Sequence, residues 1–277
     1  MLARPDGAGA ARVRRGYFEC RYGQLHVHNA IPAGGGFEEG TPLLCLHPSP
    51  LSGRLFERFL AVAGADRSIF APDLPGFGDS DPPPRDAGVT ELAAAIGDFL
   101  DVMRLRQVDL LGQGFGAVVA VELASTRPPQ IRRMVLVSPP PAPDGSTRVH
   151  PAPPAEGAAS RRPAAAADGS HLLEEWGRAM AYCGSGATPE VVTAVVAERL
   201  RNGAPAALAA AAERDYPLRA RLAQLAAPLL VLRLGSEVAS ARDVPARARL
   251  IELPDRGGSL FETAPEIAAQ ALEGFLR

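Results

Sequence analysis

Short apolar runs alternate with stretches of helical periodicity along most of this 277-residue chain. Residues 43–46 (LLCL) are apolar throughout, which is typical of a strand buried on both faces. Because strands and helices alternate, we expect an α/β fold with a mostly parallel sheet, right-handed crossovers and helices on both faces. The further predicted strands are 68–71, 108–111, 134–137, 229–234 and 250–253, and the predicted helices are 55–63, 90–103, 117–125 and 265–275.

Two segments depart from this alternation. Residues 17–28 alternate apolar and polar side chains around Gly23, which predicts a β-hairpin. Residues 139–170 are rich in Pro, Ala and Gly and carry almost no large apolar side chain, which is typical of a linker. Helical periodicity then returns at 171–180, 190–201 and 206–214. We therefore predict a core over 1–139, a linker and inserted helical cap over 140–220, and the rest of the core over 221–277.

Composition limits the partners of the chain. It has 29 basic and 31 acidic residues without a basic cluster, so we expect neither nucleic-acid nor membrane binding. No apolar run approaches the roughly 20 residues of a membrane span, and Met1 to Arg15 do not resemble a signal peptide. These features predict a cytoplasmic protein with a small-molecule partner, and a homodimer is compatible with them.

The cysteines and glycines predict no metal and no cofactor. Cys20, Cys45 and Cys183 are widely spaced, so neither a disulfide framework nor a zinc site is implied, and Cys45 is expected in the core. The glycines of residues 112–116 follow a predicted strand but lack the third glycine of a dinucleotide-binding fingerprint.

Four stretches resemble the α/β-hydrolase family. They are residues 46–53 (LHPSPLSG), 71–80 (APDLPGFGDS), 108–116 (VDLLGQGFG) and 255–261 (DRGGSLF). In the family they correspond to the loop after the third strand, the Asp-Leu-Pro-Gly turn, the nucleophile elbow and the loop that carries the catalytic histidine. The resemblance implies the α/β-hydrolase fold with an inserted cap.

The resemblance also implies which catalytic groups the chain lacks. Gly114 stands in the nucleophile slot of the elbow, and Gly258 stands where the family has its histidine. Glycine offers neither a nucleophilic atom nor a base, so hydrolysis cannot proceed through a covalent serine intermediate. Glu237 is the candidate for the third triad member, and Asp243 is the second choice. Either residue could equally well be a solvated acid on the surface.

Parts of a binding site are expected to remain. In the family, the oxyanion hole uses the N–H of the residue after the nucleophile, here Phe115, and one from the loop after the third strand. Pro48 in that loop has no N–H, but Ser49 can donate. Gly114, Gly258 and the side chains of Ser49 and Ser52 would line the site, and Trp176 would belong to an apolar cap roof.

The histidines divide into two groups. His47 ends a predicted strand, where we favour a structural hydrogen bond that holds the loop, and the alternative is an acid/base role. His26 and His28 lie on the hairpin, far from the predicted pocket, and are expected at the surface or a sheet edge. Asp73 is expected to pin a turn.

These residues favour a non-hydrolytic enzyme. It would bind a small, largely apolar, carbonyl-bearing or polycyclic metabolite and act by positioning and oxyanion-type polarisation. Isomerisation, cyclisation and carbon–carbon bond formation or cleavage are the candidate reactions, and the Ala/Arg/Gly/Pro-rich composition suggests specialised metabolism. Two alternatives remain open, a ligand-binding protein without catalysis and a residual hydrolase that uses Ser49 or a water activated by His47.

Overall fold

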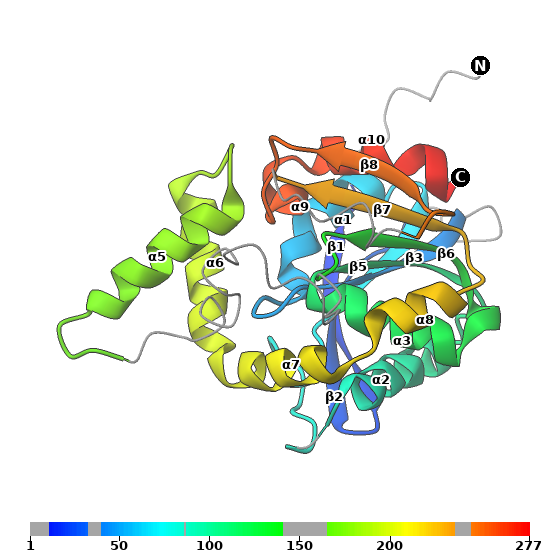
Figure 1. The fold of residues 1–277 in the computed structure, drawn as a ribbon, viewed down its shortest axis with the longest axis horizontal. Helices are drawn as coiled ribbons and strands as arrows, with labels where there is room; N and C mark the ends of the chain where they lie inside the picture. The colour runs from blue at the N-terminus through cyan, green and yellow to red at the C-terminus, as the bar shows by residue number, and fades with distance from the viewer. Residues whose placement is uncertain (1–10, 33–39, 86, 141–164, 236–244) are drawn as a thin grey trace.

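The computed structural model describes residues 11–32, 40–85, 87–140, 165–235 and 245–277, which form an α/β fold around an eight-stranded sheet (Figure 1). The strand order is β1-β2-β4-β3-β5-β6-β7-β8. The pairs β1–β2 and β2–β4 are antiparallel, and all the other pairs are parallel. The strands are β1 (Val13–Cys20), β2 (Gly23–Ala30), β3 (Gly40–Leu46), β4 (Arg67–Pro72), β5 (Val108–Gln113), β6 (Ile131–Val137), β7 (Leu229–Leu234) and β8 (Arg249–Leu253).

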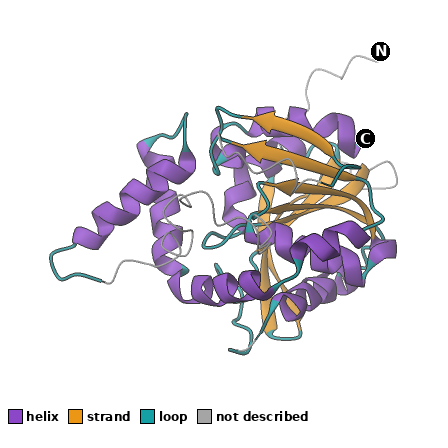
Figure 2. Ribbon diagram, viewed as in Figure 1, coloured by secondary structure: helices purple, strands orange, loops and turns teal. Residues whose placement is uncertain are grey.

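Helices cover both faces of the sheet, as Figure 2 shows. Apolar side chains of the sheet divide between two buried clusters, one under each layer of helices. One layer contains α2 (Val89–Val102), α3 (Phe115–Thr126) and α8 (Leu218–Gln224), and the other contains α1 (Glu57–Ala63), α9 (Leu260–Thr263) and α10 (Pro265–Leu276). Two short 3-10 helices, η1 (Gly53–Phe56) and η2 (Pro128–Gln130), also occur in the described parts of the chain. None of the helices in these described parts is long and apolar enough to cross a membrane.

Helices also occupy the segment for which the periodicity predicts a cap. Between β6 and β7 the chain forms α5 (Ser170–Cys183), α6 (Pro189–Arg201) and α7 (Gly203–Asp215), and α5 and α6 project from the body of the molecule (Figure 1). The buried carboxylate of Glu175 on α5 joins them, because it accepts hydrogen bonds from Arg178 at 3.2 Å and from Arg199 of α6 at 2.7 Å. Most of the predicted linker, residues 141–164, lies outside the described residues.

The expectation that His26 and His28 lie at the surface or a sheet edge is wrong. Both residues belong to β2, and both are buried. β2 is an interior strand of the sheet because it pairs with β4 as well as with β1, so β1 forms the edge of the sheet instead. Cys45, expected in the core, is fully buried there.

A buried carboxylate fixes the amino ends of the central strands. Asp109 of β5 has no exposed surface and accepts hydrogen bonds from Arg132 at 2.8 and 2.6 Å and from Arg67 at 3.0 Å. Both arginines also donate to the carbonyl oxygen of Leu276, so the same network holds the end of α10 against the sheet.

We predict that Asp109→Ala lowers the free energy of unfolding by about 3–5 kcal/mol, because it leaves two guanidinium groups without their buried partner. Urea denaturation measures the loss. Asp101→Ala is the matched control, since Asp101 pairs with Arg127 at an exposed position and should cost at most about 1 kcal/mol. Equal losses in the two variants would contradict the role given to Asp109.

Candidate functional site

Gly114 lies at the sharp turn between β5 and α3. Its φ is 51° and its ψ is −121°, a conformation that glycine adopts without strain. The neighbouring glycines allow strand, loop and helix to approach closely. A Cβ atom at Gly116 would lie 2.2 Å from the carbonyl oxygen of Leu46, and one at Gly112 would lie 2.4 Å from that of Gly116. This strand–turn–helix geometry is that of a nucleophile elbow.

The loop after β3 packs directly against the elbow. A Cβ atom at Gly114 would lie 3.1 Å from Cβ of Pro48. Phe115 is the first residue of α3, and the first N–H groups of a helix have no acceptor inside it. Phe115 thus has an N–H with no acceptor inside the helix, next to Gly114, and the expected second donor, the N–H of Ser49, follows Pro48 in the loop packed on the elbow.

His47 has the geometry of a loop-holding residue. It is fully buried, and its Nε2 accepts a hydrogen bond of 2.8 Å from the N–H of Leu74. Nδ1 must therefore carry the hydrogen, which it donates to the carbonyl oxygen of Pro48 at 3.1 Å. Burial lowers the pKa of His47 to about 4, so the ring is neutral at pH 7. Both ring nitrogens bond to the main chain, and neither is left for acid/base chemistry in this arrangement.

Ser52 and Trp176, both expected to contact a ligand, have different environments in the structure. The Oγ of Ser52 is buried and caps η1 by accepting a hydrogen bond of 3.4 Å from the N–H of Arg54. Trp176 is 36% exposed on α5, whose buried side is formed by Glu175, Ala179 and Cys183. Glu237 and Asp243 lie outside the described residues.

Gly258 lies under the phenol ring of Tyr182, from the end of α5. Two hydrogen bonds join these residues. The N–H of Gly258 donates to the carbonyl oxygen of Tyr182 at 2.7 Å, and the hydroxyl of Tyr182 donates to that of Gly258 at 2.8 Å. A Cβ atom at Gly258 would lie 2.1 Å from Cε2 of Tyr182, and one at Gly257 would lie 2.3 Å from the carbonyl oxygen of Cys183. The end of α5 therefore packs closely on this loop because neither Gly257 nor Gly258 has a side chain.

Gln113, the last residue of β5, completes the cluster. Its Nε2 donates to the carbonyl oxygen of Gly258 at 2.6 Å and to the hydroxyl of Tyr182 at 3.2 Å. The amide cannot be turned around, because a carbonyl oxygen only accepts hydrogen bonds. The Oε1 of Gln113 is consequently directed away from both groups, and it is buried without a hydrogen-bond partner.

Sequence reasoning missed this cluster. Tyr182 follows the predicted helix 171–180 and Gln113 precedes Gly114, but no pattern in the sequence connects these two residues. The one available signal was the pair of consecutive glycines, Gly257 and Gly258, in a loop where the family has a single glycine before its histidine. Two glycines in a row indicate that another segment approaches the backbone closely.

Glu262 of α9 is a second group that the sequence did not reveal. Burial raises its pKa to about 7, and the nearby carboxylates of Glu198 and Glu57 add to the increase against the opposing effect of Arg58. Its Oε2 is buried without a hydrogen-bond partner. Burial also raises the pKa of the Tyr182 phenol well above its usual value, with a further contribution from Glu262, so the phenol stays protonated and is no base at pH 7.

Asp73 fastens the loops around the elbow, in agreement with the expectation that it pins a turn. Its Oδ1 accepts a hydrogen bond of 2.7 Å from the N–H of Gly53, and its Oδ2 accepts one of 2.9 Å from that of Asp79. On β2, His26 Nδ1 also lies 2.9 Å from Asp73 Oδ2. His26, His28 and Asp73 are the group of potential metal ligands found in the described parts of the chain.

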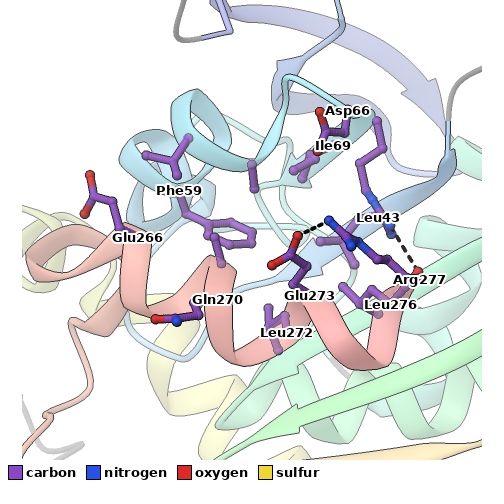
Figure 3. Close-up of a pocket in the computed structure, with 14 residues that line it drawn as sticks. Leu43, Phe59, Asp66, Ile69, Glu266, Gln270, Leu272, Glu273, Leu276 and Arg277 are labelled. Atoms are coloured by element: carbon purple, nitrogen blue, oxygen red, sulfur yellow. Dashed lines mark hydrogen bonds and ion pairs between the residues drawn. The ribbon is translucent and has the colours of Figure 1, made fainter. Parts of the chain in front are cut away.

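A cavity of about 290 Å³ lies away from the elbow, between α1 and α10. Its lining includes Leu43, Ile69 and, at the amino end of β4, Asp66 and Arg67, whereas Gly114 follows the carboxyl end of β5. Figure 3 shows Phe59 and Leu272 facing this space and the ion pair of Glu273 with Arg277 at one side.

Sheet order, elbow and inserted helices define the α/β-hydrolase class. The sequence matches the alpha/beta hydrolase family over residues 43–271, so the chain belongs to this family. Among curated relatives, it is 38% identical over 125 residues to the lipase LipV of Mycobacterium tuberculosis, covering 44% of each chain. It is 32% identical over 117 residues to a 2-hydroxymuconate semialdehyde hydrolase of Pseudomonas sp., covering 39% of this chain and 38% of the relative. The matches thus span less than half of these relatives.

Solved structures share the fold over nearly the whole chain. The epoxide hydrolase CorEH superposes with a TM-score of 0.73 at 17% identity and covers 95% of this chain and 99% of its own. The N-acyl homoserine lactonase AidH, complexed with N-butanoyl homoserine, superposes with a TM-score of 0.72 at 19% identity and covers 95% and 96%. At such identities the likeness establishes the fold alone.

We predict that Gly258→Ala lowers the free energy of unfolding by about 1–3 kcal/mol, because its methyl group overlaps the Tyr182 ring. In a Tyr182→Ala background the same change should cost clearly less. Gly274→Ala is the control, since a Cβ atom there meets nothing within 4 Å, and it should be neutral or stabilising. A cost of Gly258→Ala that does not depend on residue 182 would contradict the contact.

Glu262 should make stability depend on pH. Because its folded pKa of about 7 lies above its ordinary value of 4.5, the folded state disfavours the charged form. The free energy of unfolding should therefore fall as pH rises from about 4.5 to 7, by about 2 kcal/mol. Denaturation across this range should show that Glu262→Gln equals the wild type at pH 4 and is more stable at pH 8. Parallel pH profiles of the two proteins would contradict this assignment.

Proposed function

We propose that the chain is a non-hydrolytic member of its family, in which Gly114 occupies the place of the nucleophile and Gly258 that of the catalytic histidine. The proposal departs from the names of the relatives, which are hydrolases. The observation that carries it is the packing of Tyr182 on Gly258, because this contact leaves no room for an imidazole.

The remaining polar groups near the elbow favour the same reading. The neutral phenol of Tyr182 is a hydrogen-bond donor and a poor base. His47 uses both ring nitrogens in bonds to the main chain, which argues against a water activated by His47 or a nucleophilic Ser49. The N–H groups of Phe115 and Ser49 remain as the expected hydrogen-bond donors of the site, and they would act by polarising a carbonyl group.

The proposed ligand is a small, largely apolar metabolite with a carbonyl group, held at the elbow. The N–H groups of Phe115 and Ser49 would draw electron density toward the carbonyl oxygen, so that bonds within the ligand can rearrange in a concerted step that transfers no proton to the protein. Isomerisation, cyclisation, or carbon–carbon bond formation or cleavage would follow from positioning without a covalent intermediate. A small-molecule carrier without catalysis is the alternative that the same geometry allows.

Incubation with a library of cyclic and polycyclic ketones, esters and lactones, followed by liquid chromatography and mass spectrometry, tests the proposal. We expect a product of unchanged mass and altered retention, or one formed by coupling or cleavage without water. A compound retained in stoichiometric amount and released unchanged would favour the carrier, and products whose summed mass exceeds that of the substrate by one water would contradict the proposal.

Gly114→Leu should reduce conversion or retention at least about 10-fold, because its side chain fills the position beside the two N–H donors. Gly114→Ala, with a smaller side chain, should have a smaller effect. Gly177→Ala on α5 is the control, since a Cβ atom there has nothing within 4 Å. Equal activity of the wild type and Gly114→Leu would place the ligand elsewhere.

A further inference from the structure

Three side chains that could bind a metal ion meet below the loops that surround the elbow. His26 and His28 stand on the same side of β2, and Asp73 follows β4, the strand paired with β2. All three are buried, and one potential ligand atom from each lies within 4.8 Å of the other two. The group combines two imidazoles with one carboxylate, a donor set used for zinc and similar transition metals.

The distances between potential ligand atoms in this group lie on either side of the ligand-to-ligand spacing in a metal site. His26 Nδ1 lies 2.9 Å from Asp73 Oδ2, and His28 Nε2 lies 3.9 Å from Asp73 Oδ1. Two atoms bound at about 2.0–2.2 Å to a tetrahedral ion are about 3.3–3.6 Å apart. Shifts of a few tenths of an ångström would therefore bring these atoms to the spacing of coordination, whereas 3.9 Å is too long for a direct hydrogen bond.

The surroundings of the group resemble the outer shell of a metal site. Histidine ligands commonly direct their second nitrogen at a carboxylate, and His28 Nδ1 lies 3.0 Å from Glu57 Oε1. Ligating carboxylates are commonly held by hydrogen bonds, and Asp73 accepts them from the N–H groups of Gly53 and Asp79. The Glu57 side chain is 38% exposed, so this outer residue lies between the buried group and solvent.

We propose that His26, His28 and Asp73 bind one divalent transition-metal ion of the zinc class, with Glu57 orienting His28. Binding needs the neutral tautomer of His26 with its hydrogen on Nε2, so that the Nδ1 lone pair binds the ion in place of the hydrogen bond to Asp73. The ion fastens β2 to the loops that contain Gly53 and Asp79. Its role is structural, and it is independent of the chemistry proposed for the elbow.

Titration of the chelator-treated full chain with Zn²⁺ tests the proposal, with bound metal measured after dialysis and the melting temperature followed in parallel. We expect one ion per chain and a higher melting temperature with Zn²⁺ than with Mg²⁺, because imidazole ligands do not favour Mg²⁺. The absence of saturable Zn²⁺ binding, or equal stabilisation by Mg²⁺, would overturn the proposal.

Variants locate the ion. His28→Gln should abolish binding, while His171→Gln on α5 is the matched control and should retain it. Glu57→Gln should weaken binding about 10–100-fold, as expected for a residue that orients a ligand. Because Glu57 is half-buried, this variant remains informative if His28→Gln fails to fold, which circular dichroism would reveal. Binding that survives both His28→Gln and Glu57→Gln unchanged would place the ion elsewhere and overturn the site.

Discussion

The doubly hydrogen-bonded contact of Tyr182 with Gly258 determines what the rest of the site can do. Each residue donates to a carbonyl oxygen of the other, and the phenol ring covers the α-carbon of the glycine. Any side chain at position 258 would collide with this ring, so the contact and a catalytic histidine exclude each other. The end of α5 is thereby docked on the loop after β8, which links the cap to the core.

Around this contact, polar groups that commonly serve catalysis are used for structure. The ring of His47 bonds the loop after β3 to Leu74, and Asp73 binds the N–H groups of two further loops. Gln113 spans from the elbow to the Tyr182–Gly258 pair. The fold and the elbow of the family are present, and we propose that Gly114 and Gly258 stand in place of the side chains that would make and break an ester bond. This is the physical basis for proposing chemistry by polarisation alone.

The fold could be predicted from the sequence because its signals are local. Continuous apolar runs such as residues 43–46 mark strands buried on both faces, and Gly112 and Gly116 mark the close approach of β5 and α3. Contacts between distant segments gave no such signal. Nothing near position 182 reveals that Tyr182 lies on Gly258, and nothing in the hairpin shows that His26 meets Asp73. The same limit explains the error over His26 and His28, since the pairing of β2 with β4 buries a strand whose alternation suggested an edge.

An assay with p-nitrophenyl esters tests most directly the proposal that this member of the family does not hydrolyse its ligand. Wild type and Gly114→Ser should both give no burst and no turnover above buffer, because the serine of the variant still has no base within a closed cap. Saturable turnover by the wild type that Ser49→Ala abolishes would contradict the account and establish a hydrolase with a different nucleophile.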